Sequence, residues 1–181
     1  MGAHVHASTE PRCGDGRSAA VVVASTSAAR GEAEDVSGPL LVEWLRSRGY
    51  DCPDPVVVAD GDPVGETVRA LLEDLPDEAR PRILVTSGGT GLTPDDRTPD
   101  VVEPLLDFSV PGVMHALWTA GSATTPTAVL SRGVAGVRGR TFVVTLPGSV
   151  GAVRDGIRVL DPLLAHLQSQ LENVRDHGSR A

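Results

Sequence analysis

The 181-residue sequence contains no lysine, few aromatic residues and no long hydrophobic run. Without lysine the chain cannot carry the P-loop signature, which requires that residue after its last glycine. Aromatic residues make up only 3% of the chain, so the core must consist of aliphatic side chains. The apolar runs are far shorter than the roughly 18 residues of a membrane span, and we therefore expect a soluble protein without a membrane partner.

Positive charge and cysteine are also scarce. Sixteen arginines stand against 24 acidic residues and give a net charge of −8. A nucleic-acid-binding protein would need a broad basic surface, so we expect no nucleic acid partner. The two cysteines, Cys13 and Cys52, lie in a Gly-rich segment and a Pro-rich turn, which indicates a reducing compartment more than a disulfide. These features predict a cytoplasmic protein.

The length and the distribution of apolar residues predict one domain between two tails. Residues 1–17 contain Gly, His, Ser and Pro without periodicity and lack the regions of a secretory signal, so we expect a disordered tail there. Residues 18–175 are long enough for a single domain with its own core, and residues 176–181 form a polar tail.

Short apolar runs alternate with amphipathic patterns along this domain. Strands are expected at residues 19–25, 56–58, 83–86, 127–131 and 141–146. Helical patterns lie around residues 39–48, 62–75, 99–104, 111–118, 149–160 and 161–174. The alternation predicts a doubly wound α/β fold, with a largely parallel sheet and helices on both faces.

A glycine-rich segment follows the expected strand at 83–86. Residues 87–100 read Ser-Gly-Gly-Thr-Gly-Leu-Thr-Pro-Asp-Asp-Arg-Thr-Pro-Asp, and three glycines within four residues let the backbone approach a phosphate closely. Thr98 and Pro99 are expected to be the N-cap and first residue of a helix, whose free N–H groups favour anions. The segment supplies the candidate phosphate-binding residues Ser87, Gly88, Gly89, Thr90, Gly91 and Thr98.

Two carboxylates accompany this segment. A carboxylate repels a phosphate unless a divalent cation lies between them, so Asp96 indicates Mg²⁺ as well as phosphate. Asp60 follows the strand at 56–58 and would share the sheet edge at which ligands bind in open α/β folds. The alternative for both residues is an ordinary carboxylate in a turn.

Two later segments add candidates. Arg132 follows the strand expected at 127–131 and could offer a bidentate guanidinium to a phosphate. Pro147, Gly148 and Ser149 connect the strand at 141–146 to a helix, and Ser149 could cap that helix, bind the ligand, or do both.

Three blocks of the sequence resemble the Mog/MoaB family of molybdenum cofactor biosynthesis, which includes the gephyrin G domain. The first is residues 87–93 with Asp96 and Thr98-Pro99; the others are Leu-Ser-Arg-Gly-Val-Ala-Gly at 130–136 and Leu-Pro-Gly-Ser at 146–149. Asp35 to Pro39 and Asp60 match more weakly. Together these matches span residues 19–174.

The resemblance implies a molybdopterin-binding fold that assembles as a homotrimer and adenylylates molybdopterin with ATP and Mg²⁺, with no tightly bound cofactor. It implies Asp60 and Asp96 as catalytic metal ligands, and the loop, Arg132 and residues 147–149 as the ligand-binding residues. Thr26 stands where relatives commonly carry Asp or Asn, and Trp118 lies where they often carry a basic residue. A non-catalytic pterin-binding or scaffold protein of the same fold is therefore the alternative, and an unrelated nucleotide-binding protein is a third.

Overall fold

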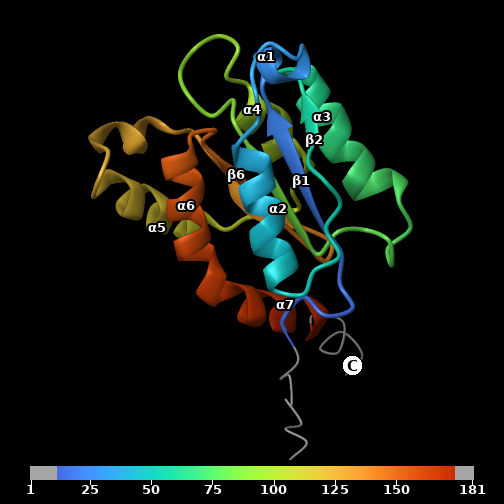
Figure 1. The fold of residues 1–181 in the computed structure, drawn as a ribbon. Helices are drawn as coiled ribbons and strands as arrows, with labels where there is room; N and C mark the ends of the chain where they lie inside the picture. The colour runs from blue at the N-terminus through green and yellow to red at the C-terminus, as the bar shows by residue number, and fades with distance from the viewer. Residues whose placement is uncertain (1–11, 174–181) are drawn as a thin grey trace, which may run out of the picture.

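The computed structural model describes residues 12–173, which form an α/β domain (Figure 1). The strands are β1 (Ala19–Ala24), β2 (Val56–Val58), β3 (Ile83–Ser87), β4 (Phe108–Ser109), β5 (Ala135–Arg138) and β6 (Thr141–Leu146). The helices are α1 (Thr26–Ala29), α2 (Ser37–Ser47), α3 (Asp62–Arg69), α4 (Thr98–Val102), α5 (Pro111–Ser122), α6 (Val150–Leu160) and α7 (Leu164–Asn173). None of the helices in this part of the chain is long and apolar enough to cross a membrane.

The six strands form one sheet in the order β2-β1-β3-β6-β5-β4. The first four run parallel, with Val22 of β1 opposite Val56 of β2 and Thr86 of β3. Strands β5 and β4 are added antiparallel at one edge. The prediction of an α/β fold with a largely parallel sheet is confirmed.

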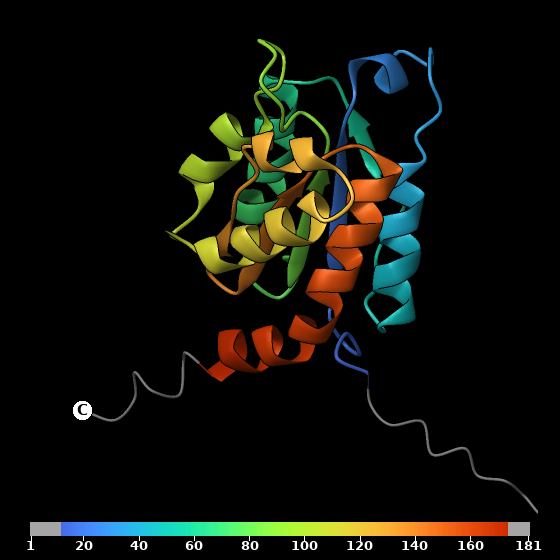
Figure 2. The same cartoon turned by 90° about the vertical axis from the view of Figure 1, so that its left-hand side faces the viewer.

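Successive residues of β1 enter two separate cores, because side chains alternate between the faces of a strand. Val21 and Val23 pack with α2, α5 and α6 on one face. Val22 and Ala24 pack with α3 and α4 on the other. Helices α2 and α6 lie side by side on the first face (Figures 1 and 2). Because helices cover both faces of the sheet, side chains on both faces of β1 are buried, which explains why β1 consists of consecutive apolar residues.

The prediction of a strand at residues 127–131 is wrong. Pro126–Leu130 is a 3₁₀ helix, and the chain enters the sheet only at β5, after Arg132. Proline has no backbone N–H and a fixed φ, which favours the start of a helical turn over a strand. β5 gives a weak strand signal in the sequence because it contains Gly136. The structure favours glycine at this position, since a Cβ there would lie 2.5 Å from the Phe108 carbonyl of β4.

The predicted N-terminal tail is too long. The Gly14 amide donates to the Arg48 carbonyl at 2.9 Å, and the Arg17 guanidinium makes two bonds of 2.6 and 2.7 Å to Glu172 of α7. Residues 12–17 are thus part of the domain. Residues 1–11 and the tail predicted at 176–181 lie outside the described residues.

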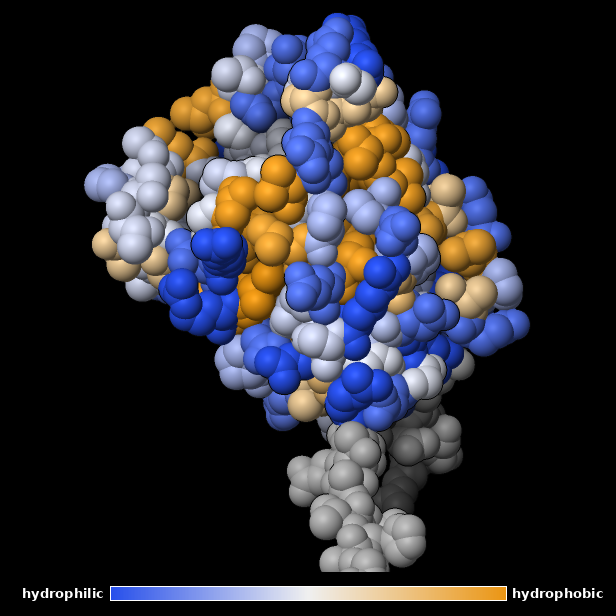
Figure 3. All heavy atoms as spheres, in the orientation of Figure 1, coloured by the Kyte–Doolittle hydropathy of each residue, from blue (hydrophilic) through white to orange (hydrophobic). Residues whose placement is uncertain are grey.

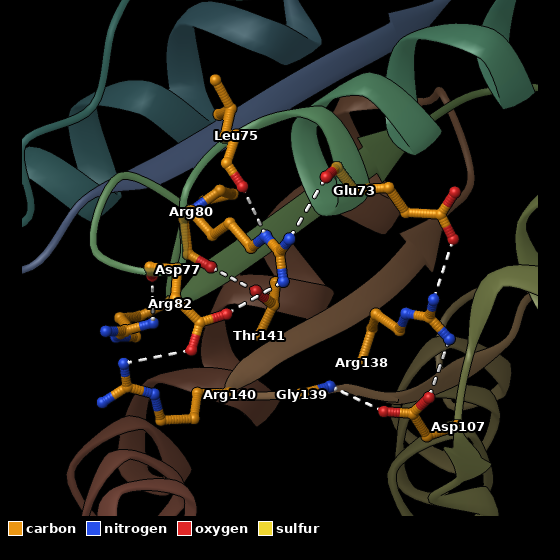
Figure 4. A network of polar contacts seen from close by, with 11 residues as sticks. Glu73, Leu75, Asp77, Arg80, Arg82, Asp107, Arg138, Gly139, Arg140 and Thr141 are labelled. Atoms are coloured by element: carbon orange, nitrogen blue, oxygen red, sulfur yellow. Dashed lines mark hydrogen bonds and ion pairs between the residues drawn. The ribbon is translucent and has the colours of Figure 1, made fainter.

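A polar network holds the edge of the sheet at which β3 and β6 begin (Figure 4). Arg80 pairs with Asp77 at 2.9 Å. Arg138, at the end of β5, pairs with Glu73 at 2.9 Å and with Asp107 at 2.8 Å. These contacts join the connection before β3 to the β5–β6 turn, and they leave the opposite edge, where the parallel strands end, for the candidate site.

Candidate functional site

The candidate residues follow four neighbouring parallel strands at their carboxyl ends. Thr26 follows β1, Asp60 follows β2, the glycine-rich loop follows β3, and Pro147 follows β6. The order of connections reverses around β1, whose neighbours β2 and β3 lie on its two sides. This is the kind of crevice in which open α/β sheets bind ligands.

The first two glycines of the loop have the positive φ that the sequence predicts. Gly88 has φ +100° and Gly89 has φ +63°, whereas Gly91 does not adopt a positive φ. A Cβ on Gly88 would collide with the Ala24 carbonyl of β1, and a Cβ on Gly89 would collide with the Thr98 hydroxyl. The amides of Gly89 and Thr90 donate no hydrogen bond within residues 12–173 and are therefore open to an anion.

Thr98 lies one position later in its helix than predicted. Arg97 occupies the N-cap position of α4 and Thr98 is the first helical residue. The Thr98 amide donates to the Gly89 carbonyl at 3.0 Å, which holds the loop against α4. Its hydroxyl is fully buried without a hydrogen-bond partner. That unpartnered group faces Gly89 inside the candidate site.

Asp60 lies beside this loop and is held by Thr26. Its Oδ2 accepts from the Thr26 amide at 2.9 Å and from the Thr26 hydroxyl at 2.8 Å. Its Oδ1 lies 3.2 Å from the point where a Cβ on Gly89 would stand. The expected convergence of Asp60 and the loop is thus present in the structure.

Asp96 is held in a similar way within the loop. Its Oδ2 accepts from the Thr93 amide at 3.1 Å and from the Thr93 hydroxyl at 2.5 Å. The side-chain hydrogen bond from Thr93 is the main cause that lowers the pKa of Asp96, and backbone bonds from Thr93 and Gly91 lower it further. The carboxylate is therefore ionised at neutral pH.

Arg132 binds the loop and is not directed into a cavity. Its Nε donates to the Gly91 carbonyl at 3.0 Å, and one terminal nitrogen donates to the Asp96 carbonyl. Both terminal nitrogens bond the Asp100 carboxylate, at 2.9 and 3.0 Å, and lower the pKa of Asp100. Through these contacts Arg132 stabilises the conformation of the loop.

A cavity of about 580 Å³ opens in front of the loop. The candidate residues that line it are Gly89, Thr90, Gly91, Asp96, Pro147, Gly148 and Ser149. Ser149 caps α6, because its hydroxyl accepts from the Ala152 amide at 3.2 Å. The N-terminus of α6, with its free N–H groups, adds a second feature that favours an anion.

Gly148 and Ser149 separate this cavity from a second one of about 360 Å³, which Ser87 also lines. Ser87 is buried at the end of β3, where its hydroxyl donates to that of Ser37 at 3.1 Å. Gly148 and Ser149 line both cavities, and Asp35 lines the second. Asp60, Gly88, Thr98 and Arg132 line neither cavity and lie behind or beside the loop.

Sequence analysis missed several lining and supporting residues. Leu92 and Leu130, exposed by 65% and 51%, form an apolar rim, and Asp155 of α6 lines the wall. Leu92 and Leu130 belong to the blocks at 87–93 and 130–136, but a leucine does not by itself indicate a residue that lines a cavity. Thr93 could have been found, because Thr93 and Asp96 have the spacing of a capping box, in which the acidic side chain accepts from the threonine amide.

The two carboxylates fit a magnesium site that is completed by substrate. Within the described residues no group of three or more His, Cys, Asp or Glu could hold a metal ion alone. Mg²⁺ usually binds through one or two carboxylates together with phosphate oxygens and water. Asp60 lies beside Gly89 and Asp96 lies beside Gly91, so each carboxylate is next to the loop whose Gly89 and Thr90 amides are open.

Comparisons with known proteins identify the family of this chain. The family described as "Probable molybdopterin binding domain" matches residues 20–166. A molybdenum cofactor biosynthesis bifunctional protein of Synechococcus elongatus is 37% identical over 89% of this chain and 49% of its own length. A molybdopterin adenylyltransferase of Pyrococcus furiosus is 36% identical over 81% of this chain and 86% of its own.

Comparison with solved structures indicates the same family. The molybdopterin biosynthesis Mog protein of Mycobacterium ulcerans is 46% identical, has a TM-score of 0.79, and is matched over 86% of this chain and 99% of its own. The chain spans about half the length of the bifunctional bacterial relatives and about a fifth of a gephyrin from Dictyostelium discoideum. With a family match over most of its length, the chain belongs to the family of probable molybdopterin-binding domains, with Mog and MoaB proteins among its relatives.

Proposed function

We propose that this chain acts in molybdenum cofactor biosynthesis by binding molybdopterin and transferring the adenylyl group of ATP to it. The observation that carries the proposal is the glycine-rich loop at the wall of a 580 Å³ cavity, with open amides at Gly89 and Thr90, Asp96 in the cavity wall and Asp60 beside Gly89. Relatives that are named molybdopterin adenylyltransferase support the same reaction.

In this reaction an oxygen of the molybdopterin phosphate bonds to the α-phosphorus of ATP, and the bond from that phosphorus to pyrophosphate breaks. The chemistry needs alignment and charge neutralisation more than a covalent intermediate. The amides of Gly89 and Thr90 would hold phosphate oxygens, and the N-terminus of α6 behind Ser149 would orient a second anionic group.

Asp60 and Asp96 would hold Mg²⁺, which would neutralise charge on the phosphates. Arg132 acts indirectly, since its guanidinium keeps the carbonyls of Gly91 and Asp96 in place and so shapes the loop. The apolar rim at Leu92 and Leu130 would cover the less polar part of a ligand.

Incubating the purified protein with molybdopterin, ATP and Mg²⁺ tests the proposal directly. We expect adenylylated pterin and pyrophosphate in equal amounts. Molybdopterin binding without turnover would instead support the non-catalytic pterin-binding alternative, and the absence of both binding and turnover would refute both functions.

We also propose that the chain works as a homotrimer, as the resemblance to Mog and MoaB proteins implies. This chain supplies the loop, both carboxylates and the residues that line the cavity, and each subunit would then carry its own site. Assembly would then stabilise the subunit and not complete the site.

A further inference from the structure

The two candidate metal ligands are each held by a threonine through the same pair of contacts. Thr26 gives its amide and its hydroxyl to Oδ2 of Asp60, and Thr93 gives its amide and its hydroxyl to Oδ2 of Asp96. Two donors from one residue restrict the rotation of a carboxylate more than a single hydrogen bond does. Both aspartates are thereby fixed in one orientation before any ligand binds.

The fixed orientation decides which oxygen remains for a ligand. Asp60 Oδ1 accepts no hydrogen bond within residues 12–173 and points toward Gly89, where the backbone amide is open. Thr93 donates to Oδ2 of Asp96, and Asp96 lines the large cavity. Carboxylates whose orientation is set in this way suit Mg²⁺, which binds through one or two carboxylates and keeps its other positions for water and phosphate.

Neither threonine is the N-cap of a helix or a buried core residue. Ser25 already caps α1, because its hydroxyl accepts from the Ala28 amide at 3.2 Å. Thr26 and Asp60 are 34 residues apart, so their contact joins the ends of two strands. Thr93 is exposed in the loop and contributes no buried side chain.

We propose that Thr26 and Thr93 are positioning residues that orient Asp60 and Asp96 for a shared divalent cation. This inference rests on the proposed function, because it assigns the cation to those two carboxylates.

Mn²⁺ with a non-hydrolysable ATP analogue is a direct probe, since electron paramagnetic resonance reports bound Mn²⁺ without turnover. In Thr26→Val and Thr93→Val the hydroxyl is lost but the shape is kept, and we expect Mn²⁺ affinity to fall about 10- to 100-fold, the usual effect of losing a partner that orients a metal ligand. Thr26→Ser and Thr93→Ser keep the hydroxyl and should stay within about threefold of the wild type.

Thr67→Val is the matched control. Thr67 is a half-buried threonine of α3 whose hydroxyl donates to the Pro63 carbonyl at 2.8 Å, outside the site, and the loss of this hydroxyl should leave Mn²⁺ affinity unchanged. In turnover assays the valine variants of Thr26 and Thr93 should raise the KM for Mg²⁺ while the KM for molybdopterin stays the same. A thermal melt of each variant confirms that it is folded, and Thr93→Ala at the exposed position provides a second folded test.

The outcomes separate the two proposals. If the wild type binds Mn²⁺ with the analogue and both folded valine variants bind it equally well, the positioning role is refuted and the proposed function stands. If the wild type itself binds no Mn²⁺ in the presence of the analogue, the proposed metal-dependent function is refuted and this inference with it.

Discussion

Asp96 has two separate tasks at the level of the residue. Its Oδ2 orders the loop through Thr93, and its charge is proposed to hold the cation. Asparagine keeps an oxygen that can accept the Thr93 bonds but loses the charge. One substitution can therefore distinguish a structural carboxylate from a metal ligand.

Asp96→Asn should lower adenylylation at least about 100-fold, as the loss of electrostatic stabilisation in a site commonly does. Molybdopterin affinity should remain, and the melting temperature should change by less than about 3 °C. Asp95→Asn is the control, because Asp95 is the exposed neighbour and lines neither cavity. Activity of Asp96→Asn within a few-fold of the wild type, or a similar loss in Asp95→Asn, would contradict the assignment.

Gly89 tests the loop itself. Because its φ is +63° and a Cβ would collide with Thr98, Gly89→Ala should destabilise the protein by about 1–3 kcal/mol and abolish ligand binding. Gly112→Ala is the contrasting change: no atom lies within 4 Å of its Cβ, and alanine in α5 should be neutral or stabilise by up to about 1 kcal/mol. Urea denaturation and calorimetric titration measure both effects, and unchanged binding in Gly89→Ala would mean that the glycine serves only the turn.

Local pattern was sufficient to predict that Asp60 and the glycine-rich loop meet, because each directly follows a parallel strand. It could not predict the role of Arg132. The partner that orients its guanidinium, Asp100, lies 32 residues earlier and the two meet only through the fold. The hydrogen bonds from Thr26 to Asp60 could not be predicted for the same reason, because the two residues are 34 positions apart in the sequence.

The elements that could be predicted from sequence are those whose apolar pattern is continuous. Strands β1, β2, β3 and β6 and the helices around them were identified because parallel strands buried on both faces consist of consecutive apolar residues. β5 was missed because it contains a glycine and ends in an arginine, and its stability comes from pairing with β4 and β6. A strand that depends on its neighbours gives little signal of its own.

The contact of residues 12–17 with α7 provides a prediction at the level of elements. Arg17 and Glu172 form a half-buried pair with two hydrogen bonds, and we expect a double-mutant cycle of Arg17→Met and Glu172→Gln to give a coupling of about 0.5–1 kcal/mol. Arg48→Met with Asp161→Asn, a second bidentate pair, gives an independent comparison. A coupling near zero would show that the pair does not hold α7.

The same pair has a defined pH dependence. The hydrogen bond from Arg17 lowers the pKa of Glu172 below its ordinary value of about 4.3. The folded state then binds the proton less readily than the unfolded state. The ion pair therefore stabilises the folded state fully at pH values above the ordinary pKa, and this stabilisation is lost as the pH falls through the lowered pKa of the folded state. Melting curves should therefore show Glu172→Gln converging with the wild type under acid conditions; a difference that persists at low pH would contradict the ion pair.

At the scale of the whole molecule, apolar surface and net charge both bear on assembly. Apolar side chains gather over α2 and α6 on the face drawn in Figure 3, and Val36 before α2 and Val56 at the start of β2 are 51% and 45% exposed. Exposed apolar groups of this kind commonly mark contacts between copies of a chain. The net charge of −8 opposes assembly through repulsion, and salt should weaken that repulsion.

We expect light scattering at micromolar concentration to give three times the 18.8 kDa chain mass, and the trimer to persist as the salt concentration rises. If each subunit carries its own site, mixing Asp96→Asn with Gly89→Ala subunits should restore no activity, since each subunit lacks a part of that site. Mixing wild-type with Asp96→Asn subunits is the control and should give activity in proportion to the wild-type fraction. A monomeric mass with full molybdopterin binding would refute the trimer, whereas recovered activity in the double mixture would show that neighbouring subunits share a site.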